Sequence, residues 1–283
     1  MLAELTRIAA PGEDHAALSA ACETGVGLCT IVGIDGSFSR RLGAQLAVLP
    51  DGSTIGSLAD GCLEAQLAAD ILTLEHPKVV RYGRGSPKID FRLPCGGGLD
   101  ILLDPAPDRA DCRRAMEALV DRKPVRLALP DISPLPERRY LPSLRIAAFG
   151  EGPELTALAA LAAAMGIELL SYDKDRLTLG RPAKDCQPDR WTAALLLFHD
   201  HEWELPLLEQ ALASEAFYVG AQGGENARIA RTLALTERGV PEEHIARIRS
   251  PIGLIPSCKT PQSLALSALA EIVGQYERLH AAA

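Results

Sequence analysis

The sequence of 283 residues lacks the features that direct a chain to a membrane, a nucleic acid or a secreted environment. No apolar run approaches the roughly 20 residues that a transmembrane helix needs, and the N-terminal stretch has no signal-peptide hydrophobic region. The formal net charge is -8, which argues against a surface that binds nucleic acid or anionic lipid. We therefore expect a cytoplasmic protein that binds neither nucleic acid nor membrane.

Motifs of several enzyme and metal-site classes are also missing. The chain has no GxSxG, no Walker A motif and no pair of carboxylates placed for glycosidase chemistry, so hydrolase and kinase functions have no support. It has seven cysteines but no CxxC pair, which argues against a structural zinc site. In the cytosol these cysteines should be reduced thiols.

Length and composition predict two domains. The segment 131–143 is rich in proline and is expected to be an irregular linker. Residues 1–130 mix strand and helix patterns and predict an N-terminal α/β domain. Residues 144–283 alternate strands and helices, which predicts a Rossmann-like, doubly wound parallel sheet.

The stretch 145–175 has the order strand, glycine turn, helix, strand, acid. Gly150 and Gly152 follow a short apolar run and precede an Ala/Leu-rich helix, whose N terminus would bind an anion such as phosphate. Asp173 comes roughly 20 residues later, where a ribose hydroxyl would be bound. Leu155 occupies the place of the third glycine of the dinucleotide fingerprint, so an ordinary βαβ crossover is the alternative.

Two histidines and a second glycine turn also follow predicted strands of this half. In doubly wound sheets, ligands bind beyond the carboxyl ends of the strands. His199 and His201 could bind a phosphate, ligate a metal jointly or transfer a proton, and a capping role is the alternative. The turn at 220–224 follows the next strand.

The N-terminal half has two cysteines beside glycines. Cys62 stands at a predicted helix start, where the helix dipole lowers a thiol pKa. Cys95 precedes Gly96 and two further glycines, which favours a thiol at a loop surface. Thiolates suit a soft metal centre or sulfur transfer, and two buried, inert cysteines are the alternative. Glu64 could accept a hydrogen bond, act as a base or be a solvated acid on the helix face.

Six segments of the chain resemble, in order, the motifs of the XdhC/CoxI family, the xanthine dehydrogenase accessory proteins. The resemblance covers about residues 25–280. The segments are GSFSRRLGAQLAVLPDGSTIGSLADGCLE, LPCGGGLDILLDP, AAFGEGPELTALAALAAAMG, FHDHEWELPLLEQAL, FYVGAQGG and SPIGLIPSCKTPQSLALSALAEIV.

This resemblance implies a molybdenum cofactor chaperone rather than an enzyme. Such a chaperone binds the molybdopterin cofactor, holds it while a cysteine desulfurase installs a terminal sulfur, and delivers it to an apo-molybdoenzyme of the xanthine dehydrogenase type. Proteins of this kind are often dimers, and the cofactor carries a phosphate or a cytosine dinucleotide. The motif cysteines are Cys62 and Cys95, which would lie beside molybdenum or its sulfur, and the motif acid is Glu64.

The chain departs from the family pattern at the Rossmann turn, and other functions stay open. Glu151 and Pro153 replace alanine and histidine, which adds a negative charge and removes one N–H donor beside the expected phosphate. One alternative is an NAD(P)-dependent oxidoreductase that uses Asp173 for the ribose and His199 or His201 as an acid. Another is an interaction protein whose nucleotide site has decayed.

Overall fold

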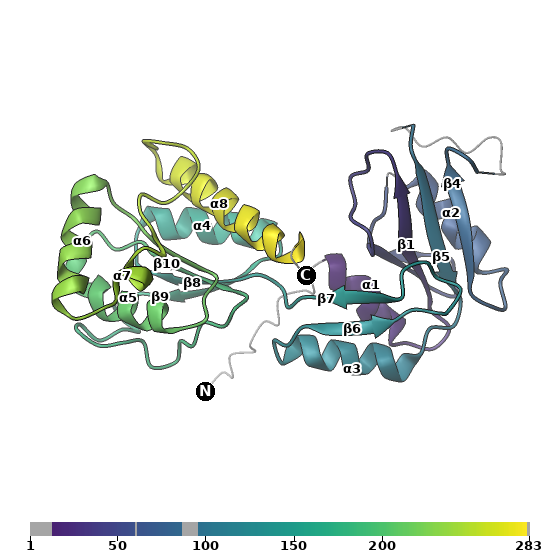
Figure 1. Ribbon diagram of the computed structural model, residues 1–283, viewed down its shortest axis with the longest axis horizontal. Helices are drawn as coiled ribbons and strands as arrows, with labels where there is room; N and C mark the ends of the chain where they lie inside the picture. Colours follow the sequence, from purple (N-terminus) through teal and green to yellow (C-terminus); the bar gives the residue numbers. More distant parts are fainter. Residues whose placement is uncertain (1–12, 60, 87–95, 282–283) are drawn as a thin grey trace. The chain divides into compact units, whose positions relative to one another are not determined.

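The computed structural model describes residues 13–59, 61–86 and 96–281. The chain divides after Pro142 into two compact domains, which Figure 1 shows and which we describe one at a time. None of the helices in the described ranges has the length and apolar character that crossing a membrane requires.

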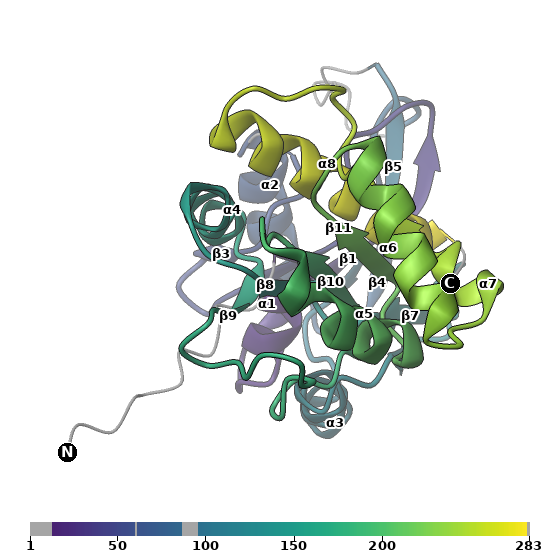
Figure 2. The same ribbon diagram turned by 90° about the vertical axis from the view of Figure 1, so that its left-hand side faces the viewer.

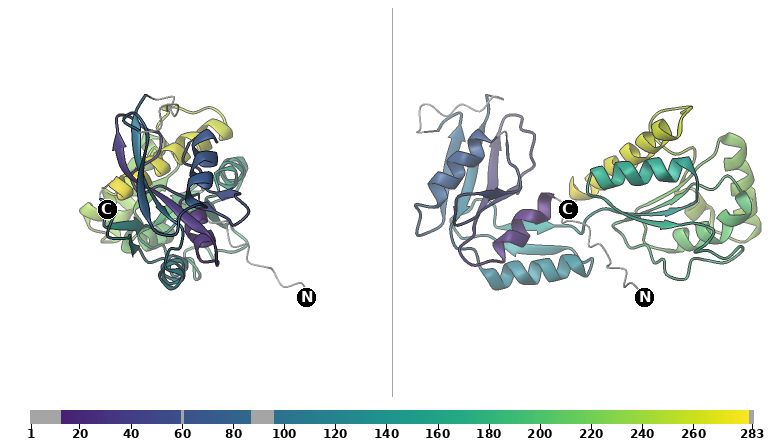
Figure 3. Two further views of the ribbon diagram at one scale, coloured as in Figure 1. Left: turned by 90° about the vertical axis from the view of Figure 1, so that its right-hand side faces the viewer. Right: turned by 180° about the vertical axis from the view of Figure 1, so that it is seen from behind.

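The N-terminal domain is built on a five-stranded antiparallel sheet of order β3-β2-β1-β5-β4. Helix α2 (Cys62–Ile71) packs along one face of this sheet through Leu63 and Leu67 (Figure 3). Helices α1 (Glu13–Ala21) and α3 (Arg109–Val120) contribute to a second cluster of buried apolar side chains. The strands are β1 (Gly27–Asp35), β2 (Gln45–Val48), β3 (Thr54–Ile55), β4 (Lys78–Gly83) and β5 (Gly98–Asp104).

The segment 131–143 is not the irregular linker that its prolines predict. Strands β6 (Val125–Ala128) and β7 (Glu137–Tyr140) form an antiparallel hairpin. The hydroxyl of Tyr140, which is 1% exposed, donates to Gln45, whose amide donates to the Thr30 hydroxyl at 3.0 Å. These buried hydrogen bonds attach the hairpin to the N-terminal sheet. The linker prediction failed because Pro136 and Pro142 lie outside β7, so its four residues can pair with β6.

The C-terminal domain confirms the expected Rossmann-like parallel sheet. Its order is β12-β11-β10-β8-β9, and every pair is parallel. The central strands are almost wholly buried, as parallel strands covered on both faces must be. The strands are β8 (Arg145–Phe149), β9 (Glu168–Tyr172), β10 (Thr192–Leu196), β11 (Tyr218–Ala221) and β12 (Ile248–Arg249).

Helices cover both faces of this sheet (Figure 2). Helices α4 (Pro153–Ala164) and α8 (Pro261–Ala281) pack against each other on one side. Helix α5 (Glu204–Ala213) covers the other side, and its Leu207 and Leu208 join the core of β8 and β10. Helices α6 (Glu225–Glu237) and α7 (Glu242–Ile245) follow β11.

Candidate functional site

Gly150 lies where the parallel sheet reverses its order. The chain leaves β8 for β9 at one edge and then returns past β8 to form β10, so β8 and β10 flank the switch point at which doubly wound sheets bind ligands. A Cβ on Gly150 would lie 2.9 Å from both the carbonyl carbon and the Cβ of Leu197, and Gly150 has φ +154°. Only glycine fits this close approach of the two strand ends.

The N terminus of α4 carries negative as well as partial positive charge. Gly152, at φ +97°, precedes the first helical residue. Glu151 is paired with Lys174 at 2.8 Å. Glu154, in the first turn, is 14% exposed and its Oε2 accepts no hydrogen bond from another described residue. The two carboxylates offset the attraction of the helix dipole for an anion.

Asp173 follows β9, as the sequence predicts, but its carboxylate takes part in the local turn. Its Oδ1 accepts hydrogen bonds from the backbone N–H groups of Asp175, at 3.2 Å, and Arg176, at 3.1 Å. This pairing fixes the residues that follow the strand. A contact from Asp173 to a ribose stays a prediction.

The two histidines after β10 have different backbone environments. His199 is 70% exposed, and its Nε2 lies 3.7 Å from Glu154 Oε2. His201 begins the 3₁₀ turn His201–Trp203 rather than continuing an extended chain. The two histidines therefore do not lie on one extended segment, and joint metal ligation by them stays a prediction. Within the described ranges, no group of three or more His, Cys, Asp or Glu side chains is placed to hold a metal ion.

In the N-terminal domain, Cys62 is exposed and is the first residue of α2. It follows Gly61, which has φ +96°. Asp60, expected to cap this helix, lies outside the described residues. An exposed thiol at a helix start meets the geometric requirement for a ligand or sulfur acceptor.

Glu64 is a buried hydrogen-bond acceptor, which agrees with one of the roles that the sequence left open and excludes the solvated acid. Its carboxylate accepts backbone hydrogen bonds from Leu58 at 2.9 Å, Ala59 at 2.5 Å and Gly61 at 2.8 Å. Burial alone would raise the pKa of this carboxyl, but the backbone donors outweigh burial and hold the pKa below its usual range. Glu64 thus stays ionised and fixes the loop that leads to Cys62.

The other glycine-flanked cysteine, Cys95, lies outside the described residues, but the glycines after it are placed. Gly96 has φ +67°, and the carbonyl of Gly97 accepts a hydrogen bond from Arg84 N at 2.8 Å. Gly98 begins β5 and pairs with Asp35, the last residue of β1.

The start of α2 and these glycines lie toward the same end of the N-terminal sheet. A Cβ on Gly27, at the beginning of β1, would lie 2.7 Å from the Cδ1 of Ile71, the last residue of α2. Helix α2 therefore runs opposite to β1, and its first residue, Cys62, lies toward the end of β1 that pairs with Gly98. The fold brings the surroundings of the two motif cysteines to one end of the domain.

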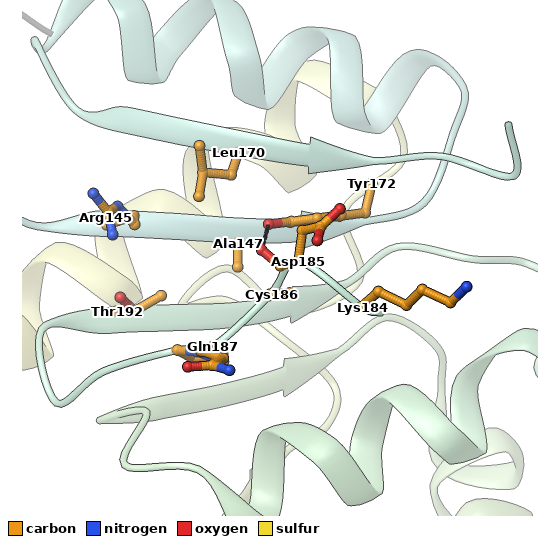
Figure 4. A pocket seen from close by; sticks show the side chains of 10 residues that line it. Arg145, Ala147, Leu170, Tyr172, Lys184, Asp185, Cys186, Gln187 and Thr192 are labelled. Atoms are coloured by element: carbon orange, nitrogen blue, oxygen red, sulfur yellow. Dashed lines mark hydrogen bonds between the residues drawn. The ribbon is translucent and has the colours of Figure 1, made fainter. Parts of the chain in front are cut away.

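The C-terminal domain has a cavity of about 460 Å³ that the sequence did not predict (Figure 4). It lies along β8 and β9, from Arg145 and Thr192 at the amino ends of β8 and β10 to Tyr172 at the carboxyl end of β9. The hydroxyl of Tyr172 donates to the carbonyl of Asp185 at 3.2 Å, and burial raises the pKa of the neighbouring Cys186 thiol. The irregular loop between β9 and β10 forms one wall, and such a loop gives no periodic sequence pattern. Tyr172 also directly precedes Asp173, and its carbonyl accepts a hydrogen bond from the Gly150 N–H at 3.0 Å.

Comparisons with known proteins connect both domains to one family. A family model described as the XdhC Rossmann domain matches residues 146–272, and one described as the XdhC and CoxI family matches residues 20–83. The chain is 35% identical over 275 residues to the molybdenum cofactor insertion chaperone PaoD of Escherichia coli K12. That alignment covers 90% of this chain and 84% of the relative.

Two further similarities are more distant. A Bacillus subtilis 168 protein, named as a probable xanthine dehydrogenase subunit, is 23% identical, with 89% of this chain and 93% of the relative covered. A crystal structure described as a xanthine dehydrogenase from Bacillus halodurans matches with a TM-score of 0.71 at 20% identity, over 92% of this chain and 95% of that chain. The structural match shows a shared fold.

Proposed function

The chain belongs to the XdhC and CoxI family, and on that premise we propose that it is a chaperone that binds the molybdenum cofactor and delivers it to an apo-molybdoenzyme of the xanthine dehydrogenase type. The observation that carries this proposal is the 35% identity to a cofactor insertion chaperone over 90% of the chain. The exposed thiol of Cys62 at the start of α2 supports it independently.

We propose that Cys62 and Cys95 approach the molybdenum end of the cofactor. Thiolates are soft ligands that suit molybdenum or its terminal sulfur. Glu64 supports this role indirectly, because its three backbone hydrogen bonds hold the loop before Cys62. Gly96 has no side chain and leaves room for a ligand beside Cys95.

In the C-terminal domain, we propose the carboxyl ends of the strands as the edge that binds a phosphate or a cytosine dinucleotide. Gly152 is exposed at the start of α4, whereas Gly150 is buried against Leu197. Asp173 follows β9 in the sequence, and His199 and His201 follow β10. Glu151 and Glu154, at the N terminus of α4, repel an anion. We therefore assign less of the affinity for the cofactor to this edge than to the cysteines. NAD(P) is the alternative ligand of the same edge.

Two partners complete the proposal. A cysteine desulfurase would supply the terminal sulfur while the chaperone holds the cofactor. A second copy of this chain would form a homodimer, which size-exclusion chromatography with light scattering would detect.

The proposal is tested by purifying the protein from a molybdate-replete cytoplasm and measuring molybdenum and the fluorescence of oxidised pterin per chain. We expect both in the wild type, and a loss of both in the Cys62→Ser and Cys95→Ser variants. The Cys258→Ser variant, which changes a partly exposed thiol in the C-terminal domain, is the matched control and should retain both. Bound NAD(H) without molybdenum or pterin would contradict the chaperone and support an oxidoreductase.

A further inference from the structure

Arg40 joins two connections of the N-terminal domain, one of which leads to the start of α2. It belongs to the connection between β1 and β2, and Ser57 belongs to the connection between β3 and α2. Arg40 donates from Nε to the carbonyl of Ser57 at 3.1 Å and from Nη2 to its hydroxyl at 3.2 Å. Because Nε and Nη2 share one edge of the planar guanidinium, a single arginine binds both oxygens of one residue.

Glu64, in the first turn of α2, binds the backbone that follows Ser57. Its Oε1 accepts hydrogen bonds from the N–H groups of Leu58 at 2.9 Å and Ala59 at 2.5 Å. The Ser57 hydroxyl in turn donates to the carbonyl of Ala59 at 3.3 Å. The residue that Arg40 binds is therefore joined to the backbone that Glu64 binds, both through the chain and through this hydrogen bond.

The connection that carries Arg40 is attached to the sheet on either side of this residue. Before it, Phe38 packs against the apolar core that the sheet shares with α2. After it, the N–H of Gly43 donates to the carbonyl of Ile31 in β1 at 2.7 Å. Arg40 therefore extends from a fixed base to Ser57.

Other contacts keep this part of the domain folded without Arg40. Leu58 is 0% exposed in the core, and a Cβ on Gly56 would lie 2.9 Å from the carbonyl oxygen of Gln45 in β2. Arg40 is itself partly exposed, so water can replace part of what its hydrogen bonds contribute. Loss of the guanidinium should therefore loosen the backbone at Ser57 and leave the domain folded.

The same contacts reach the exposed thiol of Cys62. Gly61 directly precedes Cys62, and its N–H donates to Glu64 Oε2 at 2.8 Å. The Glu64 carboxylate therefore connects the backbone that Arg40 supports to the residue before the thiol. We propose that Arg40 is a positioning residue that fixes the Cys62 thiol in the cofactor site. The inference rests on the proposed function for the identity of the ligand, but the positioning of Cys62 can be measured without any ligand.

The test uses the full-length apo-protein and iodoacetamide, with the modified peptides quantified by mass spectrometry. We expect Arg40→Gln to raise the alkylation rate of Cys62 by about threefold or more, because the loss of a hydrogen bond shifts a local opening equilibrium by about that factor. The rate of Cys22, a partly exposed thiol of the same domain, should stay that of the wild type. Arg126→Gln, which removes an exposed ion pair with Glu137, is the matched control and should change neither rate.

Two graded variants separate the positioning of Cys62 from a general loss of structure. Ser57→Ala keeps the carbonyl that accepts from Arg40 Nε and removes the hydroxyl, so it should raise the Cys62 rate less than Arg40→Gln but more than Arg126→Gln. Arg40→Lys keeps the charge but has no planar fork for two oxygens, so it should restore only part of the wild-type rate.

Buried Cys29, which is 0% exposed, reports global unfolding in the same experiment. If Arg40→Gln exposes Cys29, Ser57→Ala decides, and a Cys62 rate equal to that of the wild type in this variant would overturn the inference. In a folded Arg40→Gln protein, a Cys62 rate at or below the wild-type value would do the same. Wild-type protein that carries no molybdenum or pterin would overturn the proposed function instead, and the Cys62 rates would still decide the role of Arg40.

Discussion

Arg81 in the N-terminal domain and Arg231 in the C-terminal domain each join segments that are distant in sequence, but the two arginines differ in burial. Arg231 in α6 is 3% exposed and its partner Glu204 is 1% exposed. Arg231 donates to both oxygens of Glu204, to the carbonyl of Gln222 at 2.8 Å and to the hydroxyl of Ser250 at 3.0 Å. Arg81 in β4, by contrast, is 24% exposed and pairs with Asp35 of β1 and Asp100 of β5, which are 42% and 37% exposed.

Burial decides what each arginine contributes. Removing one partner of a buried pair leaves an uncompensated charge in a medium that cannot solvate it. Removing one partner of an exposed pair lets water and salt take its place. The same side-chain chemistry should therefore contribute more to the stability of the C-terminal domain than to that of the N-terminal domain.

The largest expected effect concerns the buried pair of Arg231 and Glu204. Arg231→Met should lower the free energy of unfolding of the C-terminal domain by about 3–5 kcal/mol, because the buried Glu204 carboxylate loses the two hydrogen bonds that Arg231 donates. Urea unfolding followed by the fluorescence of Trp191 and Trp203, the two tryptophans of the chain, measures this domain.

The control for this prediction lies on the same helix. Arg228 pairs with Glu225 in an exposed position, and Arg228→Met should cost only a small fraction of the stability lost in Arg231→Met. Adding Glu204→Gln to Arg231→Met should restore part of the lost stability, since the buried charge is then gone. A cost for Arg231→Met no greater than that for Arg228→Met would contradict the assigned role of burial.

The second expected effect concerns the switch point. Gly150→Ala should destabilise the C-terminal domain by about 3 kcal/mol, since the new methyl group would contact Leu197 at an unfavourable backbone conformation. Gly166→Ala has positive φ without any atom near the new Cβ and should cost only about 1 kcal/mol. Equal losses in the same fluorescence assay would show that close packing at Gly150 contributes nothing.

The third effect tests whether the N-terminal domain also depends on a buried charge. Glu64→Gln should cost about 2 kcal/mol at pH 7, because a carboxylate that accepts three backbone hydrogen bonds becomes a neutral amide. The folded-state pKa of Glu64 is lowered, so its contribution is complete above the unfolded pKa and is lost as pH falls through the folded value.

The difference between wild type and Glu64→Gln should therefore shrink as pH falls below about 4. Urea unfolding of the two proteins, followed by circular dichroism at a series of pH values, measures this difference. A difference that is constant between pH 7 and pH 3 would mean that the ionised carboxylate is not the stabilising form.

The smallest expected effect concerns the partly exposed ion pairs of Arg81 with Asp35 and Asp100. Arg81→Gln should lower the stability of the N-terminal domain by less than about 1 kcal/mol. This loss should decrease further in 1 M NaCl, where the Debye length is about 3 Å. A loss as large as that of Arg231→Met, in the same urea experiment followed by circular dichroism, would place Arg81 among the stabilising residues.

The sequence predicts the Rossmann-like half because its information is local. A buried apolar run, a glycine pair, a proline at the first helical position and a final aspartate all occur within 145–175, and the structure has the expected strand, turn, helix and strand there. The same kind of local pattern gave a wrong prediction at β7, because the prolines on both sides of this short strand are typical of a linker.

Contacts between residues that are far apart in the sequence leave no local pattern from which they could be predicted. Arg231 and Glu204 are 27 positions apart, and each looks like an ordinary helix charge in the sequence. The sequence left the role of Glu64 open, because only the fold brings the backbone N–H groups of Leu58, Ala59 and Gly61 to its carboxylate. The exposure of Cys62 agreed with one of the two sequence hypotheses, and packing had to decide between them.

The most direct test of the chaperone is the transfer of cofactor to a client. The loaded protein is mixed with an apo-molybdoenzyme of the xanthine dehydrogenase type, and client molybdenum content and activity are measured after the two proteins are separated. We expect molybdenum to move from the wild-type protein to the client, and no transfer from Cys62→Ser or Cys95→Ser preparations. A wild-type protein that leaves the client without molybdenum and inactive would contradict the account.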